Sequence, residues 1–164
     1  MRKITSLTLL VVTLAFVPLV FVAGTRAAEA APPTSASGSF STPAPATNVV
    51  TRSAGPNTII TDTLGSVLSG TFSGTSVLQE RYVLRADGSF IERAVETFTG
   101  TVNGVAGTAT FVDVITGDLT SSFHGSFVVV SGTGGLANLR GQGTFEGSSI
   151  TGIGTYTAQI QIHP

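Results

Sequence analysis

The sequence has no cysteine and no tryptophan among its 164 residues. Without cysteine, the chain forms no disulfide, binds no metal through thiolates and carries no lipid on a cysteine behind an export signal. Lysine occurs only at Lys3, near the start, so the rest of the chain has no lysine for Schiff-base chemistry. The formal net charge is −1, and no stretch is strongly basic. Because neutralising phosphates dominates affinity for nucleic acid, we expect no nucleic-acid partner.

The N-terminal region has the three parts of a secretory signal. Arg2 and Lys3 are basic, residues 4–23 are almost entirely apolar, and Ala28-Glu29-Ala30 offers the small residues of a cleavage site. We therefore expect residues 1–30 to form a signal peptide with a helical apolar part. Cleavage near Ala30 would release an extracellular or periplasmic protein. An uncleaved membrane anchor is the alternative, because an apolar run of about 20 residues also suits a transmembrane helix.

Behind the leader, the sequence favours one all-β domain. Residues 31–36 are rich in Pro, Ala, Ser and Thr and are expected to form a flexible linker, followed by a domain over residues 37–164. From Val49 onward Thr, Val, Ile and Phe dominate, glycine recurs, and no helical spacing of apolar residues occurs. A sheet of long consecutive strands hides its edges by closing, which predicts a single antiparallel barrel. We predict a short strand near 38–41 and strands near 48–52, 57–61, 66–73, 77–85, 89–100, 105–116, 119–131, 141–147 and 151–163.

The clearest hairpin is centred on Asp87-Gly88. This pair is preferred in two-residue type I′ turns, because both central residues need positive φ. Such a turn pairs Leu84 with Ile91. A three-residue turn is the alternative, and it shifts the register by one residue and changes which side chains share a face.

The two-residue turn places Glu80, Tyr82 and Arg93 together on the more apolar, inner face. Buried polar groups of this kind must bind one another or a ligand. Either Glu80 and Arg93 form a structural pair capped by Tyr82, or the three side chains orient a mostly apolar ligand in a central cavity. A further possibility is proton transfer by Glu80, with its pKa raised by burial. Glu96 falls on the outer face in this register.

Two stretches of the chain resemble a known family. They are GTGGLANLRGQGTF at 132–145, closed by GTYT at 154–157, and ETFTGT at 96–101, followed by Gly107. They resemble a bacterial family of unknown function with a β-barrel similar to allene oxide cyclase, also described as lipocalin-like. The resemblance covers about residues 37–164 and implies an eight-stranded antiparallel barrel with a central cavity. Because Glu96 lies in one of these motifs, it joins Glu80, Tyr82 and Arg93 as a candidate cavity residue.

The sequence contains no recognisable catalytic or metal-binding motif. It lacks a Gly-x-Ser-x-Gly nucleophile elbow, and its two histidines, His124 and His163, have no carboxylates at metal-ligand spacing. The glycine run at 132–135 lacks the lysine of a phosphate-binding loop. We therefore expect no metal and no cofactor, and the sequence identifies no catalytic residue.

Three functions remain open from the sequence. The first is a secreted, non-enzymatic barrel that binds a small apolar molecule. The second is a cofactor-free cyclase or isomerase that shapes a hydrophobic substrate, as distant relatives of the resembled family do. The third is a structural or interaction protein with a filled interior. The oligomeric state is left open.

Overall fold

The structure is a computed structural model that describes residues 32–162, so the predicted signal peptide lies outside the described residues. Between residues 32 and 162 no helix long and apolar enough to cross a membrane occurs. This part of the chain consists of antiparallel β-strands and the turns that connect them. The strands are β1 (Thr34–Ser41), β2 (Thr47–Ala54), β3 (Asn57–Gly70), β4 (Phe72–Leu84), β5 (Ser89–Val102), β6 (Val105–Asp118), β7 (Ser122–Gly134), β8 (Leu139–Ser148) and β9 (Ile153–Ile162).

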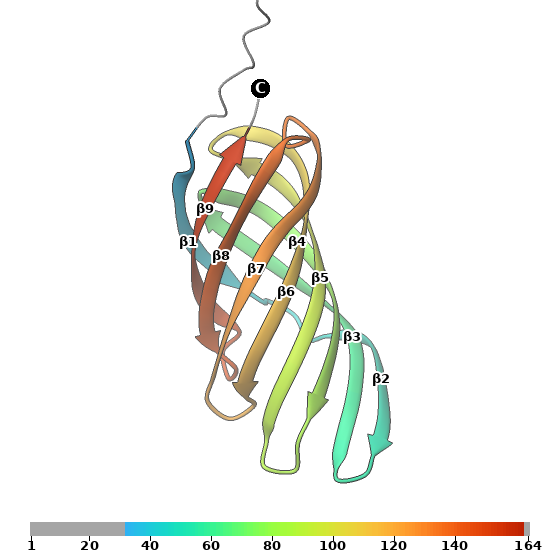
Figure 1. Cartoon of the computed structure of the whole chain (residues 1–164). Helices are drawn as coiled ribbons and strands as arrows, with labels where there is room; N and C mark the ends of the chain where they lie inside the picture. Colours follow the sequence, from blue (N-terminus) through green and yellow to red (C-terminus); the bar gives the residue numbers. More distant parts are fainter. Residues whose placement is uncertain (1–31, 163–164) are drawn as a thin grey trace, which may run out of the picture.

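The nine strands form one sheet that closes on itself into a ring (Figure 1). Neighbours in sequence pair from β2 through to β9, and β1 closes the ring by pairing with β9 on one side and with the end of β3 on the other. The remaining part of β3 pairs with β2, so β1 and β2 follow one another along the same edge of β3. The prediction of an all-β, antiparallel fold is confirmed, and closure leaves few unpaired edges.

Two boundaries differ from those expected from the sequence. The strand β1 begins at Thr34, so residues 34–36, expected in the linker, pair with β9 instead. The strand β3 is continuous where two strands were predicted, and the chain reverses at Gly70 and Thr71 instead. Gly70 has a φ of 104°, a conformation that favours glycine. The turn is therefore marked by this glycine, whereas the apolar residues around it had predicted a strand that continues to residue 73.

The hairpin between β4 and β5 has the three-residue turn, and the two-residue turn is wrong. Leu84 pairs with Phe90, and the Arg85 amide donates a hydrogen bond of 2.9 Å to the Ser89 carbonyl oxygen. Only Gly88 has positive φ here, whereas a type I′ turn would also require it at Asp87. The Asp87 carboxylate instead accepts hydrogen bonds from the amide and hydroxyl of Ser89, at 3.0 and 2.7 Å. Consequently, the faces of β5 are exchanged relative to the prediction.

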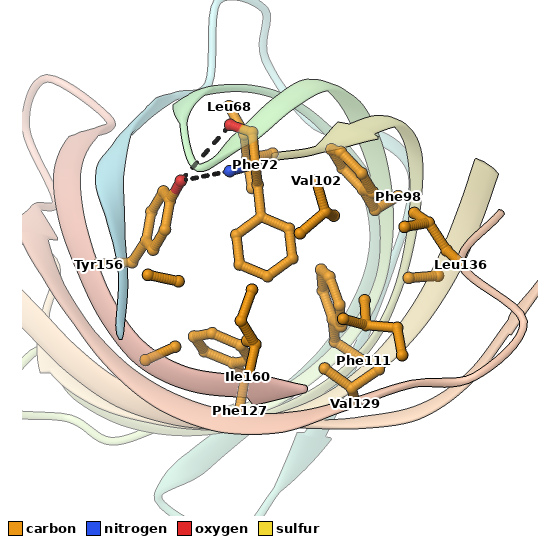
Figure 2. Close-up of a cluster of buried hydrophobic side chains, with 14 residues drawn as sticks. Leu68, Phe72, Phe98, Val102, Phe111, Phe127, Val129, Leu136, Tyr156 and Ile160 are labelled. Carbon is orange, nitrogen blue, oxygen red and sulfur yellow. Dashed lines mark hydrogen bonds between the residues drawn. The ribbon is translucent and has the colours of Figure 1, made fainter. Parts of the chain in front are cut away.

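Aromatic side chains fill one end of the ring, which we call the packed end (Figure 2). Phe72 lies at its centre and is 1% exposed. Its ring makes edge-on contacts with Phe98, Phe111 and Tyr156 at centroid distances of 5.5–5.7 Å. The Phe72 amide also donates a hydrogen bond of 2.9 Å to the Tyr156 hydroxyl. The packed end lies beside the turns β3–β4, β5–β6 and β7–β8, and the opposite end beside β4–β5, β6–β7 and β8–β9 (Figure 1).

Candidate functional site

The interior opens into a cavity of about 300 Å³ beyond the aromatic cluster. Phe72 and Tyr156 are the points where the cavity meets the packed end. At the other end it reaches Leu119, in the β6–β7 turn, and Gly152, in the β8–β9 turn. Its volume lies at the lower limit of ordinary small-molecule pockets. The ring therefore has one filled end and one hollow end, which we call the cavity end.

Five carboxyl side chains from neighbouring strands line one side of the cavity. In the sheet register, Asp62 of β3 lies opposite Glu80 of β4, Glu80 lies opposite Ala94 of β5, and Ala94 lies opposite Asp113 of β6. Because side chains alternate along a strand, the residues two before and two after Ala94 share its inward face. These five residues, the acid wall, are Asp62, Glu80, Glu92, Glu96 and Asp113.

The opposite side of the cavity is aromatic. Phe40 of β1 contacts Phe123 of β7 and Phe145 of β8, each at a centroid distance of 6.1 Å. These three rings, the aromatic wall, all line the cavity. In the ring of strands, β1, β8 and β7 lie across from β3 to β6, so the cavity has an acidic half and an aromatic half.

Burial strongly affects the two glutamates at the centre of the acid wall. Burial raises the pKa of Glu80 well above its ordinary value, and the charge of Glu92 and a hydrogen bond with Asp62 raise it further. Burial also raises the pKa of Glu92, and the charge of Asp62 adds to this effect. Because the charged form of a carboxyl is costly in an apolar cavity next to like charges, Glu80 holds its proton near neutral pH, whereas Glu92, with its pKa raised to about 7, is protonated only in part.

The flanking groups of the acid wall are shifted in the same direction. Burial raises the pKa of Asp113 to about 8, and the charges of Glu96 and Glu92 contribute to the shift. Burial also raises the pKa of Glu96. Tyr82 lies next to the acid wall, and burial together with the nearby carboxylates raises the pKa of its phenol to about 12. The interior thus disfavours negative charge that is not compensated.

Three of the four candidate residues from the sequence line the cavity. They are Glu80, Tyr82 and Glu96. Arg93 lies on the exposed outer face of β5, so its expected inward orientation and its pairing with Glu80 are wrong. The cause is the three-residue turn, which places Glu92 rather than Arg93 in the interior.

Sequence reasoning missed three members of the acid wall. Glu92 would have followed from the alternative turn, and Asp62 and Asp113 each alternate with outward residues on their strands. A buried carboxylate on an inward face carries no local signal of its own, because its partners come from other strands. His124 is exposed and contacts the Thr116 hydroxyl at 3.1 Å. Within residues 32–162, no three His, Asp or Glu residues are arranged to hold a metal ion.

We expect the protein to be more stable at pH 5 than at pH 9. Carboxyl groups with raised pKa keep their protons in the folded state while the unfolded chain loses them, so stability falls as pH rises from about 4 to about 8. At roughly 1.4 kcal/mol per pKa unit, the shift of Asp113 from 3.8 to about 8 corresponds to a loss of about 6 kcal/mol, of which about 4 kcal/mol falls between pH 5 and pH 9. Thermal unfolding followed by circular dichroism between pH 5 and pH 9 measures this loss.

Asp113→Asn is the informative variant for this prediction, because it should flatten the stability profile between pH 5 and pH 9. Asp118→Asn is the matched control, since Asp118 does not line the cavity and hydrogen bonds with Thr120 lower its pKa. It should leave the slope in that range unchanged. A melting temperature that is constant or rises from pH 5 to pH 9 would contradict the raised pKa values.

Comparison with known proteins shows one family and one fold. A family model described as "Protein of unknown function (DUF3224)" matches residues 36–158. The crystal structure of a protein with unknown function from the DUF3224 family of Shewanella oneidensis MR-1 superposes with a TM-score of 0.61 at 19% identity. The match covers 80% of this chain and 98% of the other. No curated protein matches the sequence. The predicted likeness to a family of unknown function is confirmed, and the likeness to allene oxide cyclase stays a prediction.

Proposed function

We propose a function for this chain from its cavity, because the chain belongs to DUF3224, a family of proteins of unknown function. The proposed function is binding of a small, mostly apolar molecule inside a β-barrel. The supporting observation is the cavity of about 300 Å³, which is lined by aromatic rings on one side and polar groups on the other. An apolar surface with a few convergent polar groups is the usual composition of a small-molecule site.

The closed sheet supports this function because it positions the site rigidly. Every strand from β3 to β9 pairs along both edges, so the walls cannot move apart without breaking ladder hydrogen bonds. A ring of about eight strands is just wide enough to hold packed side chains or one small ligand. Here side chains fill the packed end only, and the cavity end has room for a ligand.

A tryptophan at the cavity end tests the proposal. Ala46, between β1 and β2, lines the cavity, and Ala46→Trp should weaken binding of the neutral dye 1-N-phenylnaphthylamine by about tenfold, because the indole occupies space beside the site. Fluorescence titration measures the affinity. Ile150→Trp is the control: Ile150 is 73% exposed in the β8–β9 turn and is not a lining residue. Absence of dye binding, or equal binding by Ala46→Trp and the unaltered protein, would contradict the proposal.

A cofactor-free cyclase or isomerase is the second candidate function. One observation favours it: burial raises the pKa of Glu80 and Asp113, and a carboxyl group that stays protonated near neutral pH can act as a general acid. Turnover of a hydrophobic substrate that is lost in Glu80→Gln, with dye binding retained, would distinguish this function from binding alone.

We also propose that the binding domain acts outside the cytoplasm. The support is the basic, apolar and small-residue pattern of residues 1–30. N-terminal sequencing of the protein from its native host should find Ala31 as the first residue. An N-terminus at Met1 in a membrane fraction would favour the uncleaved anchor.

A further inference from the structure

Three carboxyl groups of the acid wall each have an oxygen without a hydrogen-bond partner. Asp62, Glu92 and Asp113 are only 8, 8 and 1% exposed, and each has one carboxyl oxygen without a hydrogen-bond partner. All three side chains line the cavity. Buried polar atoms in native proteins are nearly always paired, because an unpaired buried acceptor costs about 1–3 kcal/mol. Within residues 32–162, these three carboxyl oxygens therefore have no partner from the protein.

The protein's own cations do not face the cavity. Among residues 32–162, no arginine or histidine is a lining residue. Arg81 of β4 and Arg93 of β5 are paired neighbours in the register, yet both lie on the exposed outer face. Arg52 and Arg85 are exposed as well. The cavity is thus lined by five carboxyl groups, and these four arginines lie on the outside of the sheet or in its turns.

We propose that the cavity binds a hydrophobic organic cation, an amine or ammonium compound, with its charged end on the acid wall and its apolar body against the aromatic wall. This inference rests on the proposed binding function and specifies its ligand class. An ammonium group supplies both the missing N–H donors and the missing positive charge. A buried carboxylate paired with such a donor forms a charge-assisted hydrogen bond, which is about twice as strong as a neutral one.

The rest of the cavity fits the apolar part of such a ligand. Phe40, Phe123 and Phe145 form the aromatic wall, and Tyr82 and Phe90, 6.1 Å apart between centroids, add two further rings near the acid wall. Ring faces attract cations by about 0.5–2 kcal/mol, more when water is excluded. A volume of about 300 Å³ corresponds to roughly ten water molecules of liquid, which suits one ring with a short aliphatic chain.

Binding of a cation should release protons from the acid wall. The titratable groups that face the site are Tyr82 and the five carboxyl groups of β3, β4, β5 and β6. Burial raises the pKa of Glu80 and Asp113, and a bound ammonium favours the ionised form of the carboxyl that it contacts. Affinity for an amine should consequently rise about tenfold or more between pH 6 and pH 9, as long as the amine itself stays charged.

Three phenylpropyl compounds that differ only in the head group test the ligand class. They are 3-phenylpropylamine, 3-phenylpropan-1-ol and 3-phenylpropanoate, which are cationic, neutral and anionic at pH 7.5. Isothermal titration calorimetry should show the amine binding at least tenfold more tightly than the alcohol, and no binding of the carboxylate. For the amine, titrations in buffers of different ionisation enthalpy should show net proton release.

Isosteric variants locate the charged end. Asp113→Asn and Glu92→Gln each keep the shape of the acid wall but remove one charge, and each should weaken amine binding by about tenfold while leaving alcohol binding within about twofold. Glu146→Gln is the matched control, because Glu146 is an exposed carboxylate on β8 outside the cavity. It should not change the affinity for either compound. Circular dichroism spectra of all three variants verify that they fold.

The outcomes separate this inference from the function on which it rests. Equal affinity for the amine and the alcohol, or tighter binding of the alcohol, would overturn the cation preference and leave the binding function intact. Failure of the dye and all three compounds to bind would overturn the binding function itself. If millimolar Ca²⁺ or Mg²⁺ displaced the amine from the cavity, the acid wall would be assigned to an inorganic cation. That result would also overturn the inference.

Discussion

Replacing Gly38 with valine is expected to destabilise the protein by about 3 kcal/mol or more, because the new side chain has no space. Gly38 lies where β1 closes the ring between β3 and β9, paired with Gly70 on one side and with Tyr156 on the other. A Cβ atom at this position would overlap the Ser69 carbonyl oxygen and the Tyr156 phenol. Backbone atoms cannot rotate away as a flexible side chain can, so the strands themselves would have to separate.

The consequence for the cavity distinguishes this variant from an ordinary destabilised protein. Opening the ring at β1 exposes the edges of β3 and β9, which favours aggregation. We expect Gly38→Val to melt roughly 10 °C lower and to lose dye binding. Gly65→Val is the matched control, since Gly65 lies on β3, opposite Val77 of β4, with nothing within 4 Å of its expected Cβ. Equal melting temperatures for the two variants would contradict the closure of the ring through β1.

Replacing Phe72 with alanine is expected to cost about 3–5 kcal/mol of stability, the second large effect. Phe72 is 1% exposed and lies at the centre of the packed end, in edge-on contact with Phe98, Phe111 and Tyr156 (Figure 2). Alanine leaves a void that these aromatic neighbours cannot fill without leaving their own contacts. Chemical denaturation in urea measures the loss as a lower transition midpoint.

Two further variants separate the contributions at Phe72. Val77→Ala, on the exposed outer face of the same strand, should change stability by no more than about 0.5 kcal/mol. Tyr156→Phe keeps the ring but removes the hydroxyl that accepts the Phe72 amide hydrogen bond, at a cost of about 1–3 kcal/mol. A loss below about 1 kcal/mol in Phe72→Ala would show that the packed end is not the stabilising core.

The hairpin at Asp87 and Gly88 shows how far local sequence predicts the site. The sequence correctly indicates that the chain reverses there, because Asp-Gly is a turn pair. It leaves the length of the turn open, since Asp87 can either adopt positive φ or bind Ser89 with its side chain, as it does here. That one-residue difference exchanges Arg93 for Glu92 inside the cavity.

The candidate site also has residues that the sequence predicts and residues that it does not. Glu80 and Tyr82 were found from the sequence, because the inner face of β4 follows from apolar alternation. The acid wall as a whole could not be found, because Asp62 and Asp113 are brought to one side of the cavity by three successive pairings, β3–β4, β4–β5 and β5–β6, whose registers the sequence does not specify. Each carboxylate taken singly is typical of a solvated surface.

The sequence by itself determined that this protein is an antiparallel, all-β domain with glycine-marked turns. These features depend on the alternation of apolar and polar side chains along each strand and on the residues that favour turns, and both act over a few residues. Only the tertiary structure decided which face of β5 is internal, that five carboxyl groups converge, and that one end of the ring is hollow. The first depends on the length of the β4–β5 turn, and the other two depend on how successive strands pair and on how β1 closes the sheet against β3 and β9.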